Sequence, residues 1–460
     1  MKTVNNSLKT ILLYPFFAAP FLLSGCGDFF DEKSDKKLVL MDKLEHLQAL
    51  LDNPAYVNSN YCTAGEASSD NFYLTDGNFL TLREDEQNQY TWNASHVFSE
   101  AALSANTWRG TYSSIYTCTS ILDAIEKIEK NSINEAQWSS IKGQALAIRA
   151  YRYLDAVLIW SPAYDRQTSS TDLGIPLRLD PDFNLPSIRA SVEETYNQII
   201  RDAKTSIPLL PVANINAYRA SKPFAYGLLA RTYLAMREYE QAGLYADSCL
   251  QLRNTLLDFN TINQSTPYPF AELNEETIFM GVAFYDMITM DFNARIDPSL
   301  YDSYSNNDLR KTLFFAPNDD SSIRFRGSYI GAPTLFMGFS TSEQYLVRAE
   351  CLARSGRIDE AMETLNALLD TRWSGDTFTP LGANSSGEAL QIILQERRKE
   401  LVMRGLRWMD LKRLNKEGAD ITLTRTVDGQ TYQLLPNDPR YALTIPEDVI
   451  ALSGMPQNPR

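Results

Sequence analysis

The residues of this sequence with the clearest potential for chemistry are Glu396 and Glu400, two carboxylates four positions apart. Paired carboxylates hydrolyse glycosides when separate elements hold them ~5–9 Å apart, one as acid and one as base or nucleophile. Here both lie on one predicted helix, and Arg397, Arg404 and Arg407 have helical spacings that allow them to pair with these acids. The pattern therefore favours a lattice of salt bridges over catalysis.

The two histidines do not complete a catalytic or metal-binding pattern. His46 lies on an amphipathic stretch and fits a solvated helix face, whereas His96 lies in a loop region rich in aromatic residues. Neither histidine has a partner at the spacing of a metal site, and no common hydrolase or nucleotide-binding motif occurs. We expect no catalytic residue, no cofactor and no metal ion.

Cys26 is the cysteine whose surroundings predict a modification. Lys2 and Lys9 precede an apolar run that is too short to cross a bilayer but has the length of a signal-peptide core. The run ends in Leu-Ser-Gly-Cys at 23–26, which resembles the bacterial lipobox, where the cysteine receives lipid on its thiol. The sequence therefore predicts a lipoprotein signal peptide over 1–25 and a lipid anchor on Cys26.

The other four cysteines show neither a Cys-x-x-Cys pair nor metal-ligand spacing. They lie in apolar or loop segments, which favours small buried side chains. A disulfide between the first two is chemically allowed outside the cytoplasm, and the sequence alone does not decide it. The four are Cys62, Cys118, Cys249 and Cys351.

Composition and charge describe an acidic globular protein. The chain has 460 residues, of which 44% are hydrophobic, and a formal net charge of −14. Such a charge repels phosphate backbones, so we expect no nucleic-acid partner. Residues 26–37 are polar and dense in charge and predict a flexible acidic tether. Residues 38–460 form the predicted body, with no later stretch long enough for a membrane helix.

Three segments of the body predict the helices that must position its loops. Residues 139–160 carry apolar side chains on two sides of a 3.6-residue period, as expected for a helix packed on two faces. Residues 221–252 and 342–369 each predict two helices joined by a short turn. Each pair places two alanines 12 positions apart, which matches the tetratricopeptide spacing: Ala230 with Ala242, and Ala349 with Ala361.

The predicted fold is therefore mainly α, a tetratricopeptide-like superhelix of helix pairs with long, loop-rich insertions. The two recognisable pairs lie far apart in the sequence, so we expect insertions within one helical domain and no second fold. Short strand-like runs at 277–284 and 433–435 do not predict a large sheet. The insertions are 52–100, 162–190, 254–340, 371–386 and 420–460.

Aromatic residues in these insertions are the candidates for ligand binding. Flat aromatic faces bind the C–H faces of sugars, and amide or carboxylate side chains beside them satisfy the hydroxyl groups. Tyr73, Trp92, Asn93 and Tyr285 lie in segments with this mixture. Each aromatic ring could equally be an anchor that packs its loop onto the helices, and the sequence leaves both interpretations open.

The order of the motifs resembles the SusD/RagB family of Bacteroidetes surface lipoproteins. The resemblance covers nearly the whole chain, although Thr119 stands where the family usually has Asn and Trp160-Ser161 replaces an aromatic–Gly pair. The stretches that carry it, besides the lipobox, are Trp108 to Ile115, Ala147 to Tyr153, Leu173 to Leu177, Leu228 to Leu234, Asn307 to Arg310, Val347 to Glu350, Glu396 to Leu401, Arg404 to Leu411 and Met455 to Pro459.

This resemblance implies a non-catalytic protein that binds an oligo- or polysaccharide and delivers it to a SusC-like TonB-dependent transporter. It also implies lipid anchoring at the outer membrane, and the acids Asp28, Asp31 and Glu32 resemble the family's surface-export signal. The alternative that the resemblance leaves open is a peptide-binding or purely structural lid subunit of such a transporter.

Overall fold

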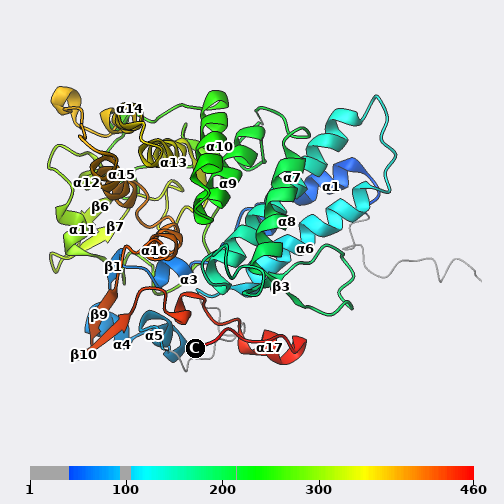
Figure 1. Ribbon diagram of the computed structural model, residues 1–460, viewed down its shortest axis with the longest axis horizontal. Coiled ribbons are helices and arrows are strands. Elements are labelled where there is room, and N and C mark those ends of the chain that lie inside the picture. Colours follow the sequence, from blue (N-terminus) through cyan, green and yellow to red (C-terminus); the bar gives the residue numbers. More distant parts are fainter. Residues whose placement is uncertain (1–40, 94–104, 214) are drawn as a thin grey trace, which may run out of the picture. The chain divides into compact units, whose positions relative to one another are not determined.

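The computed structural model describes residues 41–93, 105–213 and 215–460 (Figure 1). The predicted signal peptide, Cys26 and the tether lie outside the described residues, as do His96 and the end of the insertion predicted at 52–100. The chain is mainly helical, as predicted, and residues 41–460 form one compact unit.

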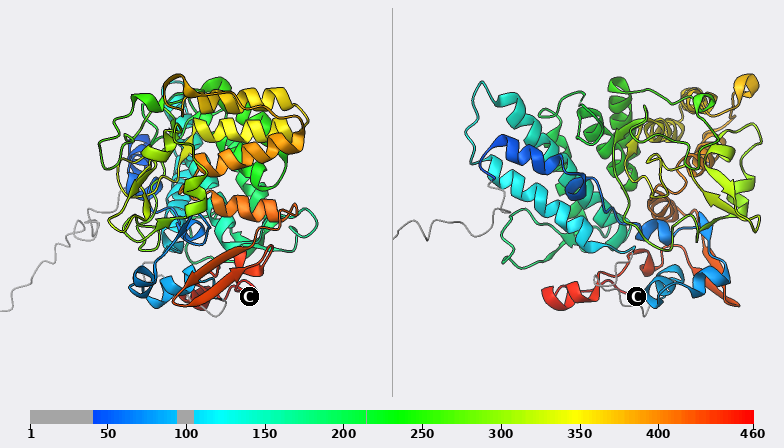
Figure 2. Two further views of the ribbon diagram at one scale, coloured as in Figure 1. Left: turned by 90° about the vertical axis from the view of Figure 1, so that its left-hand side faces the viewer. Right: turned by 180° about the vertical axis from the view of Figure 1, so that it is seen from behind.

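Eight helices of this unit pack in an order that follows the sequence. Helix α7 contacts both α6 and α8, α10 contacts both α9 and α13, and α13 also contacts α14 and α15. Figure 2 shows the last three side by side. Their bounds are α6 (Trp108–Ile125), α7 (Glu135–Trp160), α8 (Val192–Ser206), α9 (Lys222–Ala235), α10 (Tyr239–Leu252), α13 (Thr341–Arg354), α14 (Ile358–Asp370) and α15 (Ser386–Glu400).

Helix α7 confirms the segment predicted at 139–160 and starts one turn earlier. Its added turn packs Trp138 against α6, where the indole Nε1 donates a hydrogen bond to the Ile125 carbonyl at 3.1 Å. Nearly every position from Ile141 to Trp160 is buried, because α6 and α8 cover opposite sides. The helix ends before Pro162, which disfavours helical backbone at the preceding residue.

The two predicted helix pairs are α9–α10 and α13–α14, and small residues let them approach closely. A Cβ atom placed on Gly243 of α10 would lie 2.9 Å from the Cβ of Cys351 on α13. The two pairs therefore meet across a contact that only glycine permits at this position. All four alanines at the predicted spacing are fully buried: Ala230, Ala242, Ala349 and Ala361.

The insertions contain short helices and five two-stranded antiparallel sheets. The strand pairs are β1 (Phe72–Tyr73) with β5 (Arg295–Ile296), β2 (Leu173–Pro176) with β3 (Arg189–Ser191), β4 (Thr277–Phe279) with β8 (Phe339–Ser340), β6 (Phe315–Pro317) with β7 (Ile323–Phe325), and β9 (Leu423–Val427) with β10 (Gln430–Leu434). Across the described ranges no larger sheet forms, in line with the sequence, although β4 is shorter than the run predicted at 277–284.

Nine further short helices lie before, within and after the helical body of the described chain. They are α1 (Leu44–Leu51), α2 (Pro54–Val57), α3 (Ala64–Ala67), α4 (Asp76–Leu80), α5 (Glu84–Tyr90), α11 (Pro298–Asp302), α12 (Arg310–Leu313), α16 (Arg407–Asn415) and α17 (Glu447–Ser453). Among the helices that the structure describes, none combines the length and the hydropathy needed to cross a membrane.

The four cysteines of the body are buried thiols, in agreement with the interpretation as small core side chains. Cys62 donates its Sγ–H to the Ala105 carbonyl at 3.2 Å, and Cys249 donates to the Pro223 carbonyl at the same distance. Burial raises the pKa of the Cys118 thiol to about 12, so this side chain stays protonated and unreactive at neutral pH.

Candidate functional site

The two carboxylates with the clearest chemical potential, Glu396 and Glu400, are enclosed in ion pairs. Arg310 of α12 lies 2.6 Å from a Glu396 oxygen and 3.3 Å from a Glu400 oxygen. Arg372, which follows α14, lies 2.8 Å from Glu400 and 2.7 Å from Glu276. All of these side chains are buried, so the carboxylates lack the access to substrate that hydrolysis requires.

The predicted salt-bridge lattice is present, but the predicted partners are wrong. Of the three neighbouring arginines, Arg397 pairs with Asp410, Arg407 pairs with Asp70, and Arg404 packs on the ring of Tyr329. Side chains on one buried helix point to different neighbours, so each carboxylate is paired by whichever guanidinium faces it from another element.

Charge keeps the enclosed Glu400 ionised. Burial by itself would raise the pKa of Glu400, but Arg372 and Arg310 outweigh that effect and lower the pKa overall. A carboxylate held in this form has no proton to donate as a general acid. Because Glu400 lies between two guanidinium groups, we assign it a structural role and not a catalytic one.

Two of the exposed aromatic residues of the described chain, Tyr285 and Phe292, lie on the segment that β5 joins to β1, whereas Tyr56, Tyr116 and Phe183 are exposed elsewhere. Tyr73 is half-buried and stands opposite Arg295 in the antiparallel ladder. Tyr285 and Phe292 lie on the loop before β5, and they are 55% and 50% exposed. We name residues 72–78 and 283–296 the aromatic loop region.

Hydrogen bonds hold the 283–296 loop in shape. The buried Asp286 carboxylate accepts bonds from the Ile288 and Thr289 amides at 2.9 and 3.0 Å and from the Thr289 hydroxyl at 2.6 Å. The Asn78 amide donates to the Asn293 carbonyl at 2.9 Å and so joins α4 to the loop. The exposed ring of Tyr285 therefore stands on an ordered support.

Trp92 differs from its prediction as a sugar platform, because its ring is an anchor. The side chain is 5% exposed, and its Nε1 donates to the Ser68 carbonyl at 3.0 Å. A buried indole needs an acceptor for its N–H group, and turning inward toward α3 provides one. Asn93 is exposed, and its Nδ2 donates to Asn88 Oδ1 at 2.8 Å.

The structure thus brings the segments of all four candidates together, but the buried Trp92 does not share an exposed surface with the others. The Tyr90 hydroxyl at the end of α5 accepts a hydrogen bond from the Leu74 amide at 2.8 Å, which places the segment with Trp92 and Asn93 beside Tyr73. Sequence reasoning missed Phe292, whose exposure depends on the turn around Asp286. No sequence period marks such a turn.

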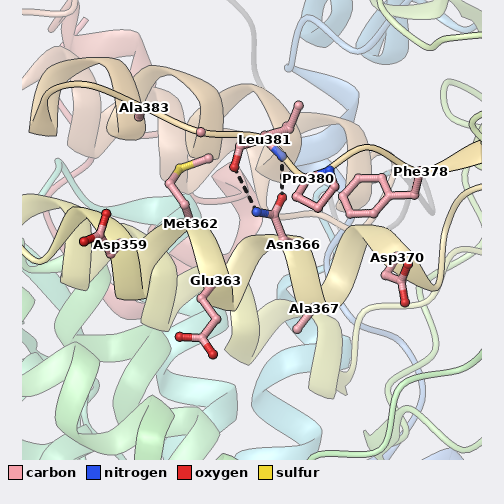
Figure 3. A pocket seen from close by; sticks show the side chains of 11 residues that line it. Asp359, Met362, Glu363, Asn366, Ala367, Asp370, Phe378, Pro380, Leu381 and Ala383 are labelled. Carbon is pink, nitrogen blue, oxygen red and sulfur yellow. Dashed lines mark hydrogen bonds between the residues drawn. The ribbon is translucent and has the colours of Figure 1, made fainter.

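A hollow of about 620 Å³ lies beside α14, where residues 378–383 run along the helix (Figure 3). The Asn366 amide exchanges two hydrogen bonds with the Leu381 main chain, both at 2.9 Å, so this amide is already satisfied within the protein. The other polar side chains around the hollow are carboxylates of α14: Asp359, Glu363 and Asp370. These acids are separated along the helix and do not form a binding constellation.

Nowhere in the described ranges do three His, Cys, Asp or Glu side chains gather as metal ligands. The aromatic loop region is the candidate that the sequence indicated, and it carries the exposed rings of Tyr285 and Phe292 beside the half-buried Tyr73. Such a surface can bind a ligand with apolar faces and hydroxyl edges.

Comparison with known families agrees with this architecture. A model described as "Starch-binding associating with outer membrane" matches residues 28–234, and the SusD family model matches residues 336–444. A SusD-like protein of Formosa agariphila is 24% identical over 372 residues, which are 64% of this chain and 69% of the relative. A SusD-like protein of Bacteroides ovatus is 26% identical over 166 residues, which are 35% of this chain and 29% of the relative.

Solved structures share the fold over most of the chain. A putative sugar binding protein from Bacteroides vulgatus superposes with a TM-score of 0.72 at 21% identity and covers 91% of this chain and 98% of its own. A SusD superfamily protein from Bacteroides thetaiotaomicron gives a TM-score of 0.71 at 20% identity, with 91% and 100% covered.

The chain thus shares its fold with a solved SusD superfamily protein. The chain belongs to the SusD/RagB family, whose matching description is starch-binding and associated with the outer membrane.

Proposed function

We propose that this protein is a surface lipoprotein that binds a glycan in the aromatic loop region and passes it, unchanged, to a TonB-dependent outer-membrane transporter. The observation that carries the proposal is the exposure of Tyr285 and Phe292 on an ordered loop beside Tyr73. Two exposed rings on one loop, with a third ring on the paired segment, can cover the apolar C–H faces of a sugar.

Calorimetric titration with a panel of polysaccharides and peptides tests the proposed ligand class. Replacing a stacking ring by Ala removes ~60–100 Å² of buried apolar area, which at ~25 cal/mol per Å² costs about 1.5–2.5 kcal/mol. We expect Tyr285→Ala and Phe292→Ala each to weaken glycan binding by roughly ten- to seventyfold. Their melting temperatures should change little, because both rings are half exposed.

Two control variants separate binding from folding. Phe183→Ala removes an exposed ring from the β2–β3 loop and should leave both affinity and melting temperature unchanged. Trp92→Ala should lower the melting temperature, since the indole is a buried anchor. Wild-type affinity in both Tyr285→Ala and Phe292→Ala would refute the proposed site, whereas binding of peptides but no glycan would favour the peptide-handling alternative.

The absence of turnover is tested in the same samples. Reducing ends should not accumulate in mixtures of the protein with the polysaccharide that it binds. Release of reducing ends that stops when a specific carboxylate is replaced would contradict the non-catalytic part of the proposal.

Lipid anchoring rests on Cys26 and its lipobox-like context. Labelled fatty acid should enter the wild-type protein and should not enter Cys26→Ala, which should also leave the membrane fraction. A labelled, membrane-bound Cys26→Ala protein would contradict the anchor.

Association with the transporter is supported by the family's description as associated with the outer membrane. A tagged chain purified from mild-detergent extracts of its native membrane should carry a TonB-dependent transporter with it. Tyr285→Ala should retain the transporter, because it alters the ligand site alone. A chain that retains the transporter but binds neither glycan nor peptide would instead be a structural lid.

A further inference from the structure

We propose that a cavity beside Arg253 is a second binding site, which takes a carboxylate attached to an aliphatic group. The cavity, of about 670 Å³, lies between residues 212–213 and 215–223, the end of α10 and residues 273–278. We call it the Arg253 cavity. Its lining differs from that of the aromatic loop region, because none of its described lining residues is aromatic.

Arg253 provides an unneutralised guanidinium at this cavity. Its Nη2 donates to the Glu275 carbonyl at 2.9 Å, and its buried Nε has no acceptor among the described residues. The described chain places no carboxylate within ion-pair distance of it, whereas the buried Arg231 is paired with Glu343 at 2.6 Å. A half-buried cation with an unused donor is completed most favourably by an anion.

A hydroxyl group on the cavity wall also lacks a partner among the described residues. Thr277 is fully buried, and its Oγ1 has no hydrogen-bond partner among the residues that the structure describes. Ser221 stands at the N-cap of α9, but its side chain makes no capping bond. Arg253 and Thr277, each with a polar atom that has no partner among the described residues, thus line one cavity.

Aliphatic side chains at the edge of the cavity indicate that part of the ligand is apolar. Four exposed aliphatic side chains surround the opening: Val212, Ile215, Leu252 and Leu273. Exposed aliphatic groups around a polar centre match an amphiphilic ligand. Peptide C-termini with an aliphatic last residue and fatty acids share this chemistry. A sugar acid does not share it, because its hydroxyl groups would meet aliphatic side chains.

Two further charged side chains line the cavity: Glu275 opposes an anionic ligand, and Arg219 is already paired with Asp52. The exposed Glu275 carboxylate also lines the cavity and reduces its affinity for anions. Arg219 lines it too, but it is held by Asp52 through bonds of 2.7 and 2.6 Å. Arg253 is therefore the cation that decides binding, and removal of the Glu275 charge should strengthen it.

Titration of the full chain with small probes tests the site. N-acetyl-leucine and octanoate should bind, whereas N-acetyl-leucinamide and glucuronate should bind at least tenfold more weakly. Stronger binding of N-acetyl-leucine than of octanoate would assign the site to peptide C-termini, and the reverse order would assign it to fatty acids. Equal binding of N-acetyl-leucine and its amide, or no binding of either carboxylate, would overturn the proposal.

Variants locate the binding in the Arg253 cavity. Arg253→Met should weaken N-acetyl-leucine binding tenfold or more, and Glu275→Gln should strengthen it. Arg166→Met, which removes an exposed arginine from another loop, should have no effect. Thr277→Val provides a second test if Arg253→Met lowers the melting temperature, and it should also weaken binding. Unchanged binding in folded Arg253→Met or in folded Thr277→Val would exclude this cavity. Glycan binding is measured separately and does not depend on these outcomes.

Discussion

The guanidinium carbon of Arg425 lies 4.6 Å from the centre of the Trp92 ring, and this contact joins the β9–β10 hairpin to the end of α5. The same guanidinium donates to the carbonyls of Tyr90, Ala67 and Ser69, and no carboxylate of the described residues pairs with it. Burial lowers the pKa of Arg425 to about 10, which leaves the side chain charged at neutral pH. Arg425 therefore organises the support beneath the aromatic loop region.

Removal of this arginine should destabilise the protein more than it affects the ligand surface. We expect Arg425→Met to lower the free energy of unfolding by about 2–4 kcal/mol, because three buried carbonyls lose their donor. Combined with Trp92→Ala, its effect should be less than additive, since the two side chains contact each other. A double-mutant cycle in urea measures this, and strict additivity would contradict the coupling.

The enclosed ion pairs around Glu400 should behave as a structural unit. Glu400→Gln leaves Arg372 and Arg310 with one fewer counter-charge inside the protein, and breaking a buried pair costs about 3–5 kcal/mol. Urea unfolding of folded Glu400→Gln should show such a loss, with ligand affinity retained. The exposed Arg357–Glu360 pair is the control, because solvent screens it and Glu360→Gln should change stability far less than Glu400→Gln does. Equal losses in the two variants would contradict the assignment.

These two clusters show which features the sequence could predict. Helices α7, α9, α10, α13 and α14 follow from a 3.6-residue apolar period and from alanines at a fixed spacing, both of which are local patterns. The partners of Glu400 are not local, since Arg310 and Arg372 lie 90 and 28 residues away in insertions without a period. Their positions depend on the packing of α12 and of the turn after α14.

The candidate site also combines features that the sequence could predict with features that it could not. The composition of the insertions indicated that aromatic residues matter, but it could not distinguish an anchor from a platform. Trp92 turns inward because an acceptor is available at Ser68, and Tyr285 turns outward because Asp286 folds the chain behind it. Both outcomes are decided by hydrogen bonds to main-chain groups, which leave no signature in the pattern of side-chain types.

Asp70 should make stability depend on pH in the acid range. Its carboxylate lies 2.7 Å from Arg407 and 3.2 Å from Arg398. Burial would raise the pKa of Asp70, but these two arginines outweigh it and lower the pKa from 3.8 to about 2. A carboxyl group with a depressed folded-state pKa stabilises the protein fully above its unfolded value, and this contribution disappears as the pH falls to the folded value.

The pH window therefore runs from about 4 down to about 2. Compared with Asp70→Asn, the wild-type protein should be more stable by roughly 2 kcal/mol above pH 5, and the difference should shrink below pH 4. Urea unfolding of both proteins between pH 2 and pH 7 measures the difference directly. A difference that stays constant across this range would show that the ion pair does not titrate as expected.

The close contact between Gly243 and Cys351 should make the stability of the protein sensitive to any added atom at Gly243. A methyl group on Gly243 would approach the Cβ of Cys351 to 2.9 Å, which forces α10 and α13 apart. Overpacking of this kind costs about 1–3 kcal/mol, and it exceeds the roughly 1 kcal/mol that alanine gains over glycine in a helix. Gly243→Ala should therefore lower the melting temperature, although Ala is the better helix former.

A second substitution tests whether the close approach is the cause. Cys351→Gly removes the atom that the new methyl group would meet, so in that background Gly243→Ala should be neutral or stabilising. Gly387→Ala is the matched control, because a Cβ at Gly387 of α15 would meet only Ser385 Oγ, at 4.0 Å. That variant should raise stability slightly, as expected for an unobstructed helical site. If Gly243→Ala is equally destabilising with and without Cys351, the helix pairs do not depend on this contact.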